Sequence, residues 1–339
     1  MTEELKKRFK ELLSYAKHVA ELTDRTMEEI VKGEPQYLYE AAMHLIRAGG
    51  KRLRPLATVL AGRMYGLPEE LGVKAGAAVE ILHNFTLIHD DIIDRDNLRR
   101  GVPTVHVLWG TDVAIIAGDL LFAKAFEALG KLAEHVPPER VVKAFDKLSW
   151  ASITIAEGQA LEFDMVKRDN VTLDEYITMV YKKTGALFEA SLLIGAILAG
   201  APQEELEKLS RYARGIGIAF QIQDDILGLI STEEKLGKPV YNDIREGKKT
   251  ILVIYALKHL SPEERSKLLS TLGKKDATRE ELEEAANLIK KTGAVEYAKN
   301  EAKKYFEDAL NALHSTEPVD EKARKLLEDL GWYVILRGK

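Results

Sequence analysis

The sequence predicts an all-α fold, a single-domain bundle of long helices. Nearly every segment repeats its apolar residues with helical period, and the strict alternation typical of strands is absent. Most glycines and prolines fall between these periodic runs. Several runs are long but lack a sustained heptad, which favours a large bundle over a coiled coil. No solenoid repeat and no Pro/Ser-rich linker divides the chain, so we expect one domain over residues 1–339.

The periodic runs give the order of the predicted helices. The first is charged and amphipathic, the fourth is apolar on nearly all sides, and a glycine pair separates the second from the third. The one long irregular segment, 231–247, is rich in charge, and we expect it to form a mobile flap over a functional site. The helices are predicted at about 2–22, 36–47, 52–66, 69–98, 111–134, 138–168, 172–200, 204–230, 248–259, 262–272, 278–312 and 320–336.

The bulk composition excludes several classes of protein. Of 339 residues, 46% are hydrophobic and 30% charged, and the net charge of −5 argues against nucleic acid as the main partner. The absence of cysteine excludes disulfides, a thiolate nucleophile and cysteine ligands for zinc. The first residues have the pattern of a charged amphipathic helix and not of a signal peptide, and no uncharged apolar stretch is long enough to be a convincing transmembrane span. We therefore expect a cytoplasmic protein. Abundant Glu and Lys with few Asn and Gln are typical of a thermophilic source.

Two groups of aspartates interrupt apolar helical runs. Asp90, Asp91 and Asp94 lie within LIHDDIIDRD, and Asp224 and Asp225 are the only charges within GIGIAFQIQDDILGLI. Removing a carboxylate from water is costly unless it is paired or coordinates a metal. Solvated helix faces or helix caps are the alternative interpretation. Two such clusters of oxygen ligands favour magnesium, with a diphosphate completing its coordination shell.

Basic residues lie at the start of one predicted helix and at the end of the first acidic helix. Lys51 and Arg54 follow the glycine pair at a predicted helix start, where cations and free amides form an anion site, unless this is a solvated basic turn. Arg99 and Arg100 end the first acidic helix, where they either balance the aspartates or bind diphosphate with their guanidinium groups.

Other polar residues are ambiguous by themselves. His83, two turns before the first aspartates, has the pattern of a satisfied core histidine as well as of a ligand. Lys183 and Thr184 lie mid-helix beside a glycine, where a lysine usually extends toward solvent. Gln159 and Glu162 are one helical turn apart.

Together these segments resemble the trans-isoprenyl diphosphate synthase family, the farnesyl and geranylgeranyl diphosphate synthases, and are most similar to its archaeal type. The matching motifs follow in order, from GGKRLRP at 49–55, DDIID and RRG at 90–101, EGQALEFD at 157–164 and KTGAL at 183–187 to FQIQDDILG at 220–228 and GKPVYNDIREGKKT at 237–250. The resemblance implies the isoprenoid synthase fold, in which mostly antiparallel helices surround a deep central cavity, and a homodimer.

The resemblance also implies a role for each candidate site residue. Up to three Mg²⁺ ions would be held by Asp90, Asp91, Asp94, Asp224 and Asp225. The diphosphate of the allylic substrate would be contacted by Arg99, Lys183, Lys238 and Lys248. The diphosphate of isopentenyl diphosphate would be bound by Lys51, Arg54, His83 and Arg100. The developing allylic cation would lie near Thr184 and Gln221, with Gln159 in the polar wall opposite.

The implied activity is that of a prenyltransferase. A dimethylallyl, geranyl or farnesyl diphosphate ionises with the help of metal, isopentenyl diphosphate attacks the cation, and a proton is lost to the released diphosphate. The cavity must exclude water, which would quench the cation. One departure from the family pattern stands at Gly228, where the second motif often carries a third aspartate. We expect Asp224 and Asp225, completed by water, to serve on that side.

Product length is predicted from two positions before Asp90. Phe85 is large and Thr86 is small, a pattern that resembles archaeal-type enzymes with a twenty-carbon product. Aromatics at both positions suggest fifteen carbons, and small residues at both suggest longer chains. The resemblance therefore implies geranylgeranyl diphosphate as main product, with farnesyl diphosphate as the alternative or a co-product. Phe85 as an ordinary core residue is the competing interpretation.

Two other functions are less consistent with the motifs. A terpene cyclase would share the fold and the first aspartate motif, but its second motif would carry Asn or Asp, then Ser or Thr, then Glu, where this chain has DDILG. A non-catalytic regulatory subunit of a prenyl synthase would have lost acidic or basic site residues, which are present here.

Overall fold

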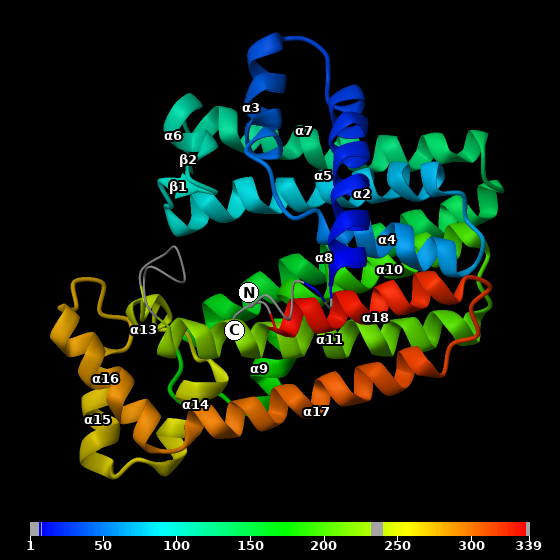
Figure 1. Ribbon diagram of the computed structural model, residues 1–339. Coiled ribbons are helices and arrows are strands. Elements are labelled where there is room, and N and C mark those ends of the chain that lie inside the picture. The colour runs from blue at the N-terminus through cyan, green and yellow to red at the C-terminus, as the bar shows by residue number, and fades with distance from the viewer. Residues whose placement is uncertain (1–6, 8, 232–239, 337–339) are drawn as a thin grey trace.

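The computed structural model describes residue 7 and residues 9–231 and 240–336, and it confirms the predicted all-α fold (Figure 1). The helices are α2 (Lys10–Ile30), α3 (Gln36–Arg47), α4 (Leu53–Met64), α5 (Glu69–Asp94), α6 (Val105–Trp109), α7 (Thr111–Gly130), α8 (Pro138–Val166), α9 (Leu173–Val180), α10 (Ala186–Ala199), α11 (Gln203–Ile230), α13 (Asn242–Glu246), α14 (Ile251–His259), α15 (Pro262–Thr271), α16 (Arg279–Lys291), α17 (Ala294–His314) and α18 (Glu321–Leu336). Among the described residues, no helix has the length and apolar character needed to cross a membrane.

The long helices pack in a continuous series. α7 lies against α5, α5 against α4, α4 against α10, α10 against α11, and α11 against α17. α2 and α3 stand across the upper helices, while α13 to α16 form the yellow and orange projection at the lower left (Figure 1). The series places α5 and α11, the two helices that carry the aspartates, on separate layers of the bundle.

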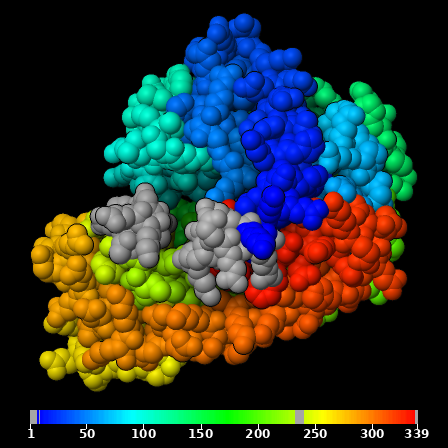
Figure 2. All heavy atoms as spheres, in the orientation of Figure 1, coloured from blue at the N-terminus to red at the C-terminus, as the bar shows by residue number. Residues whose placement is uncertain are grey.

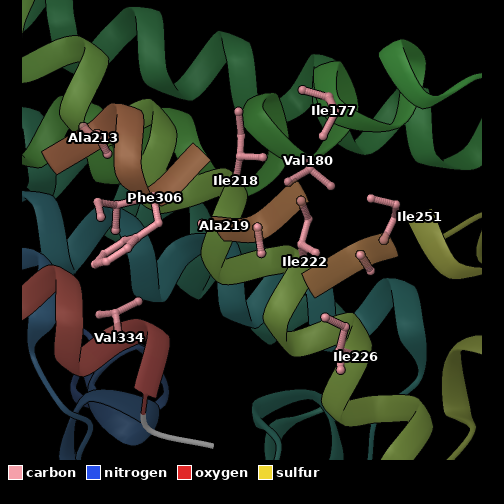
Figure 3. Packing of buried hydrophobic residues seen from close by; sticks show 14 of the residues in the cluster. Ile177, Val180, Ala213, Ile218, Ala219, Ile222, Ile226, Ile251, Phe306 and Val334 are labelled. Carbon is pink, nitrogen blue, oxygen red and sulfur yellow. The ribbon is translucent and has the colours of Figure 1, made fainter. Parts of the chain in front are cut away.

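The core beneath the second aspartate group is aliphatic. Ile218 and Ile222 project from α11 among Val180 of α9 and Ile251 of α14, and all four are buried (Figure 3). A second buried cluster fills the space among α3, α5, α7 and α8. Burying such side chains stabilises the fold by about 1.5–3 kcal/mol each, so these clusters hold the helices on both sides of the candidate site in place.

Several predicted boundaries were wrong for identifiable reasons. The helix predicted at 69–98 ends at Asp94, because Arg95 takes a left-handed conformation with φ 58°. A two-residue hairpin follows, in which β1 (Leu98–Arg99) pairs with β2 (Val102–Pro103), so Arg99 and Arg100 do not belong to the acidic helix. The helix predicted at 278–312 is two helices, since Gly293 at φ 82° interrupts it.

The helix predicted at 172–200 also divides. A π-helical turn, Tyr181–Gly185, separates α9 from α10. No pattern in the sequence indicates this turn, because a π turn inserts one residue without breaking helical periodicity by more than a single step. The short helices α6 and α13 were missed as well, and the first predicted helix lies partly outside the described residues.

The contact between α4 and α10 depends on glycine. An added Cβ at Gly195 would stand 2.1 Å from the carbonyl oxygen of Thr58, and a methyl group at Gly62 would press on Leu67. The two helices therefore approach at a distance that only glycine permits.

We predict that Gly195→Ala lowers the free energy of unfolding by about 1–3 kcal/mol, because a backbone oxygen cannot yield to the methyl group. The matched control is Gly130→Ala at the end of α7, where the new Cβ would meet the Phe145 ring at an ordinary 3.4 Å. That change should be neutral or stabilise by up to about 1 kcal/mol. Thermal unfolding compares the two variants, and an unchanged melting temperature for Gly195→Ala would contradict the close packing.

Candidate active site

A cavity of about 360 Å³ lies among α8, α9, the π turn, α11 and the segment that starts α13 and α14. Figure 2 shows this face of the molecule, with the teal segment near α6 above and the yellow-green segment below. Seven of the residues to which the resemblance assigns a role in the site line the cavity together: Arg99, Lys183, Thr184, Gln221, Asp224, Asp225 and Lys248. Lys238, also singled out, lies outside the described residues.

The first aspartate group ends α5 and is not part of the cavity lining, but it interacts electrostatically with cations that line the cavity. Burial raises the pKa of Asp90 to about 6, against the opposing effect of the Lys183 cation. Desolvation also raises the pKa of Asp94, and the Lys248 and Lys183 cations oppose it. Because Lys183 and Lys248 line the cavity, the carboxylates at the end of α5 interact with the charges of the cavity wall.

Asp91 is the buried member of this group. Its Oδ1 accepts a hydrogen bond from Arg99 Nε at 2.5 Å, while its buried Oδ2 has no hydrogen-bond partner. The pKa of Asp91 is raised by burial, and Arg99 counteracts the shift. A buried oxygen without a donor is costly, and a cation or a donor from a ligand is what would satisfy it.

The second aspartate group lies near the end of α11. Asp225 is 6% exposed, and both of its oxygens are occupied: Oδ2 accepts from the Tyr176 hydroxyl at 2.6 Å, and Oδ1 accepts from Gln221 Nε2 at 3.0 Å. Burial and the neighbouring Asp243 carboxylate raise the pKa of Asp225 to about 7. Asp224, on the cavity lining, is the more accessible of the pair.

The departure from the family pattern at Gly228 has a structural counterpart. A Cβ at this position would stand 3.2 Å from Asp243 Oδ2, and the Tyr241 amide donates to the Gly228 carbonyl at 3.2 Å. The carboxylate of Asp243, from α13, thus occupies the space that a side chain at 228 would need. Sequence reasoning placed Asp243 in the charged segment over the site but did not connect it with Gly228.

The π turn presents Lys183 and Thr184 between two glycine contacts. A Cβ at Gly158 of α8 would stand 2.4 Å from the Lys183 nitrogen, and a Cβ at Gly217 of α11 would stand 2.8 Å from the Gly185 Cα. Both helices therefore lie directly against the backbone of the turn. π turns occur often at functional sites, and this one aims the two polar side chains into the cavity.

Arg99, Lys183 and Lys248, the cavity cations predicted from the sequence, each pair with a carboxylate. Lys183 donates to Glu162, which also accepts from Gln159 Nε2 at 3.3 Å. Lys248 Nζ lies 2.6 Å from Glu246 and 3.8 Å from Asp243. From the sequence, Gln159 and Glu162 were only an ambiguous polar pair, and the structure identifies Glu162 as the partner of Lys183.

A second cationic group lies beside the first. The pKa of His83 is held well below its ordinary value by burial and by the nearby Arg54, Arg100 and Arg99 cations, so its ring is neutral. Arg54 Nε is buried without a partner, and burial lowers the pKa of Arg54. Desolvation likewise lowers the pKa of Arg100. Such a surplus of desolvated positive charge fits an anion.

The structure adds an arginine that the sequence did not single out. Arg52 is buried at φ 48°, and its guanidinium group donates to Asp24 at 2.7 Å, to Glu80 at 3.1 Å and to the Ile46 carbonyl at 2.6 Å. It therefore anchors the basic turn from within, while Lys51 is exposed with its ammonium group 5.7 Å from the Tyr333 ring.

The two predicted chain-length residues lie outside the cavity lining. Phe85 is half-buried, and its ring packs edge-on against Phe122 of α7 at a centroid distance of 5.3 Å. Thr86 Oγ1 donates to the His83 carbonyl at 2.7 Å. The role of Phe85 and Thr86 in product length stays a prediction.

The carboxylates suit an open magnesium site and not a closed protein cage. In the part of the chain that the structure describes, no group of three or more His, Asp or Glu residues could hold a metal ion by itself. Mg²⁺ usually takes one or two carboxylates and completes its shell with water and phosphate oxygens. Aspartates on two separate helices beside paired cations fit that arrangement.

Comparison with known proteins identifies relatives over nearly the whole chain. The polyprenyl synthetase family model matches residues 35–289. The geranylgeranyl diphosphate synthase of Sulfolobus acidocaldarius is 44% identical over 96% of this chain and 98% of that protein.

Solved structures agree. A geranylgeranyl pyrophosphate synthetase from Pyrococcus horikoshii is 41% identical with a TM-score of 0.90, covering 97% of this chain and 99% of that one. A polyprenyl synthase from Caulobacter crescentus, complexed with calcium and isoprenyl diphosphate, is 34% identical with a TM-score of 0.86, covering 97% of each chain. The resemblance drawn from the sequence is confirmed, and the chain belongs to the polyprenyl synthetase family.

Proposed function

We propose that this chain is a geranylgeranyl diphosphate synthase, which condenses isopentenyl diphosphate with dimethylallyl, geranyl and farnesyl diphosphates. One observation carries the proposal: the site contains two adjacent groups of cations, which offer separate places for two diphosphates. The cations of the first group pair with carboxylates, whereas the second group has more positive charge than its neighbouring carboxylates neutralise. A reaction that joins two diphosphate substrates needs such a pair of subsites. The names of the relatives from Sulfolobus and Pyrococcus support the choice of product.

The allylic diphosphate would bind where cations and aspartates meet. Arg99, Lys183 and Lys248 now pair with Asp91, Glu162 and Glu246. When the diphosphate arrives, these cations can exchange their carboxylate partners for its oxygens. Bound Mg²⁺, in up to three ions, would add positive charge to the leaving diphosphate and so favour ionisation. Asp90, Asp94 and Asp224, together with the unpartnered Oδ2 of Asp91, are the best placed to hold it, because the oxygens of Asp225 are already hydrogen-bonded.

Isopentenyl diphosphate would bind at the second cationic group. Arg54 offers its unpaired Nε, neutral His83 can donate one hydrogen bond, and Arg100 and Lys51 add charge. Thr184 and Gln221 contribute oxygen atoms beside the place where the allylic cation develops. We assign the final proton transfer to the released diphosphate, which these cations hold next to the reacting carbons.

We also propose that the enzyme is a homodimer through the face of α6, α7 and α8. Large apolar side chains stand exposed there, and Ile116 is 54% exposed. Several large apolar side chains exposed on neighbouring helices favour an interface. A second copy would cover these side chains: Val107, Leu108, Ile115, Ile116, Phe122, Val142 and Ile153.

A Mg²⁺-dependent condensation assay with labelled isopentenyl diphosphate tests the function. With each allylic primer, chromatography of the dephosphorylated products should show mainly the twenty-carbon alcohol, and chelation of the metal should stop turnover. Cyclic hydrocarbons, or no turnover with any primer, would contradict the proposal. A wild-type product longer than twenty carbons would contradict the chain length alone.

Metal binding should depend on pH through Asp90. Its carboxyl keeps a proton up to a pKa of about 6, whereas in the unfolded chain it ionises near 3.8. The metal-free fold therefore loses stability as the pH rises through this window, and Mg²⁺, which needs the ionised form, binds more tightly.

We predict that the affinity for Mg²⁺, titrated calorimetrically with inorganic diphosphate present, rises from pH 5 to pH 7 and then levels off. Asp90→Asn should weaken binding and flatten the rise, while turnover falls by several orders of magnitude. The control Asp96→Asn changes a neighbouring exposed carboxylate and should retain the rise. Equal pH dependence in the wild type and Asp90→Asn would refute a ligand role for Asp90.

Product length should follow the size of residues 85 and 86. Phe85→Ala should shift products beyond twenty carbons with turnover roughly preserved, and Thr86→Phe should shift them toward fifteen. The control is Phe126→Ala on α7, which belongs to the same row of packed rings and should lower stability without changing the product. Phe85 would be plain core if its variant kept the twenty-carbon product and lost as much stability as a typical core Phe→Ala change, about 3–5 kcal/mol.

A further inference from the structure

Tyr176 is a buried residue at the edge of the cavity, and the proposed reaction assigns it no role. It is 1% exposed and belongs to the cavity lining. We propose that Tyr176 is a positioning residue, which through Asp225 turns the oxygen of the Gln221 amide toward Thr184 and the allylic cation. The inference rests on the proposed function, because the cation is the species that this orientation would serve.

The hydrogen bonds form one chain with a defined direction. The Tyr176 hydroxyl donates to Asp225 Oδ2 at 2.6 Å, and this leaves Oδ1 for Gln221 Nε2, which donates at 3.0 Å. With its nitrogen turned to Asp225, the amide of Gln221 presents Oε1 to the Thr184 hydroxyl, which lies 3.4 Å away. Each group thus fixes the orientation of the next.

The orientation matters because the two ends of an amide have opposite partial charges. The oxygen is partly negative and stabilises a developing cation, whereas the NH₂ group is partly positive and repels it. A freely rotating glutamine would present either end. The carboxylate of Asp225 also polarises the amide and increases the charge on its oxygen.

Tyr176 is well suited to hold this chain in place. It lies in the first turn of α9, where a reciprocal capping box between Thr172 and Glu175 fixes the start of the helix. Its backbone amide donates to the Thr172 carbonyl at 3.1 Å. The ring is packed among the buried residues of the core, so its hydroxyl has little freedom to leave Asp225.

The competing explanation is that Tyr176 only satisfies a buried carboxylate and so stabilises the fold. The matched control for this role is Tyr212, which lies on α11 and is also fully buried. Its hydroxyl donates to the Leu327 carbonyl at the same 2.6 Å, in the interface with α18 and away from the cavity lining. Tyr212→Phe removes an equivalent buried hydrogen bond without touching the chain of Asp225, Gln221 and Thr184.

The test compares Tyr176→Phe with Tyr212→Phe in steady-state kinetics. Both should lower the melting temperature. Only Tyr176→Phe should lower kcat, by about tenfold or more, the change expected from losing one hydrogen bond to a charged group. KM for both substrates and the affinity for Mg²⁺ with inorganic diphosphate should stay within about threefold, because the diphosphate contacts are intact.

A double variant then asks whether Tyr176 acts through Gln221. Gln221→Leu removes the amide and should itself lower kcat, and adding Tyr176→Phe should lower it no further. The proposal would be overturned if the decreases in kcat of the two single variants multiplied in the double variant, or if Tyr176→Phe left kcat unchanged. It would also be overturned if Tyr176→Phe lowered the affinity for Mg²⁺ and diphosphate as much as it lowered kcat. An inactive wild type would instead refute the proposed function, so the two failures are distinguishable.

Discussion

The opposition between carboxylates and cations across the cavity is the interaction on which the rest of the structure depends. Asp90 and Asp94 lie in the last turns of α5, and Asp224 and Asp225 lie near the end of α11. Neither helix has a basic residue in its last turn. The carbonyl end of a helix carries partial negative charge, so the end of α5 is unfavourable for an anion, and on α11 the burial of Asp225 is unfavourable for its charge. Only cations from other elements, and ligands that bring more positive charge, make this arrangement tolerable.

The packing of the bundle supplies those cations at fixed places. Glycines at 158 and 217 let α8 and α11 touch the backbone of the π turn, which aims Lys183 and Thr184 into the cavity. The short β hairpin returns Arg99 to Asp91, and α13 brings Asp243 over Gly228. The aliphatic core below α11 prevents these elements from moving apart. Charge that no ligand neutralises therefore lowers the stability of the ligand-free protein.

Some of this could be predicted from the sequence and some could not. Helical periodicity predicted the order of the long helices and even the bounds of α3, because amphipathic faces leave a direct pattern. The aspartates stood out because charge is rare in apolar runs. The π turn, the hairpin that carries Arg99, and the break at Gly293 left no such pattern, since each depends on a few backbone angles.

Ion pairs and hydrogen bonds between residues far apart in the sequence also could not be predicted. Nothing near Glu162 identifies Lys183 as its partner, and nothing near Tyr176 identifies Asp225, because these pairs are 21 and 49 residues apart in the chain. Arg52 resembled its basic neighbours in sequence, yet its guanidinium group is buried among carboxylates and carbonyls. Such assignments require the tertiary structure.

The most direct test of this account is the affinity for inorganic diphosphate, measured by calorimetry with and without Mg²⁺ near neutral pH. If carboxylates and cations neutralise each other until both ligands arrive, diphosphate should bind at least tenfold more tightly with Mg²⁺, and Mg²⁺ more tightly with diphosphate by the same factor. The same affinity for diphosphate in the presence and absence of Mg²⁺ would contradict the account, because the cations would then bind diphosphate without any help from the aspartates.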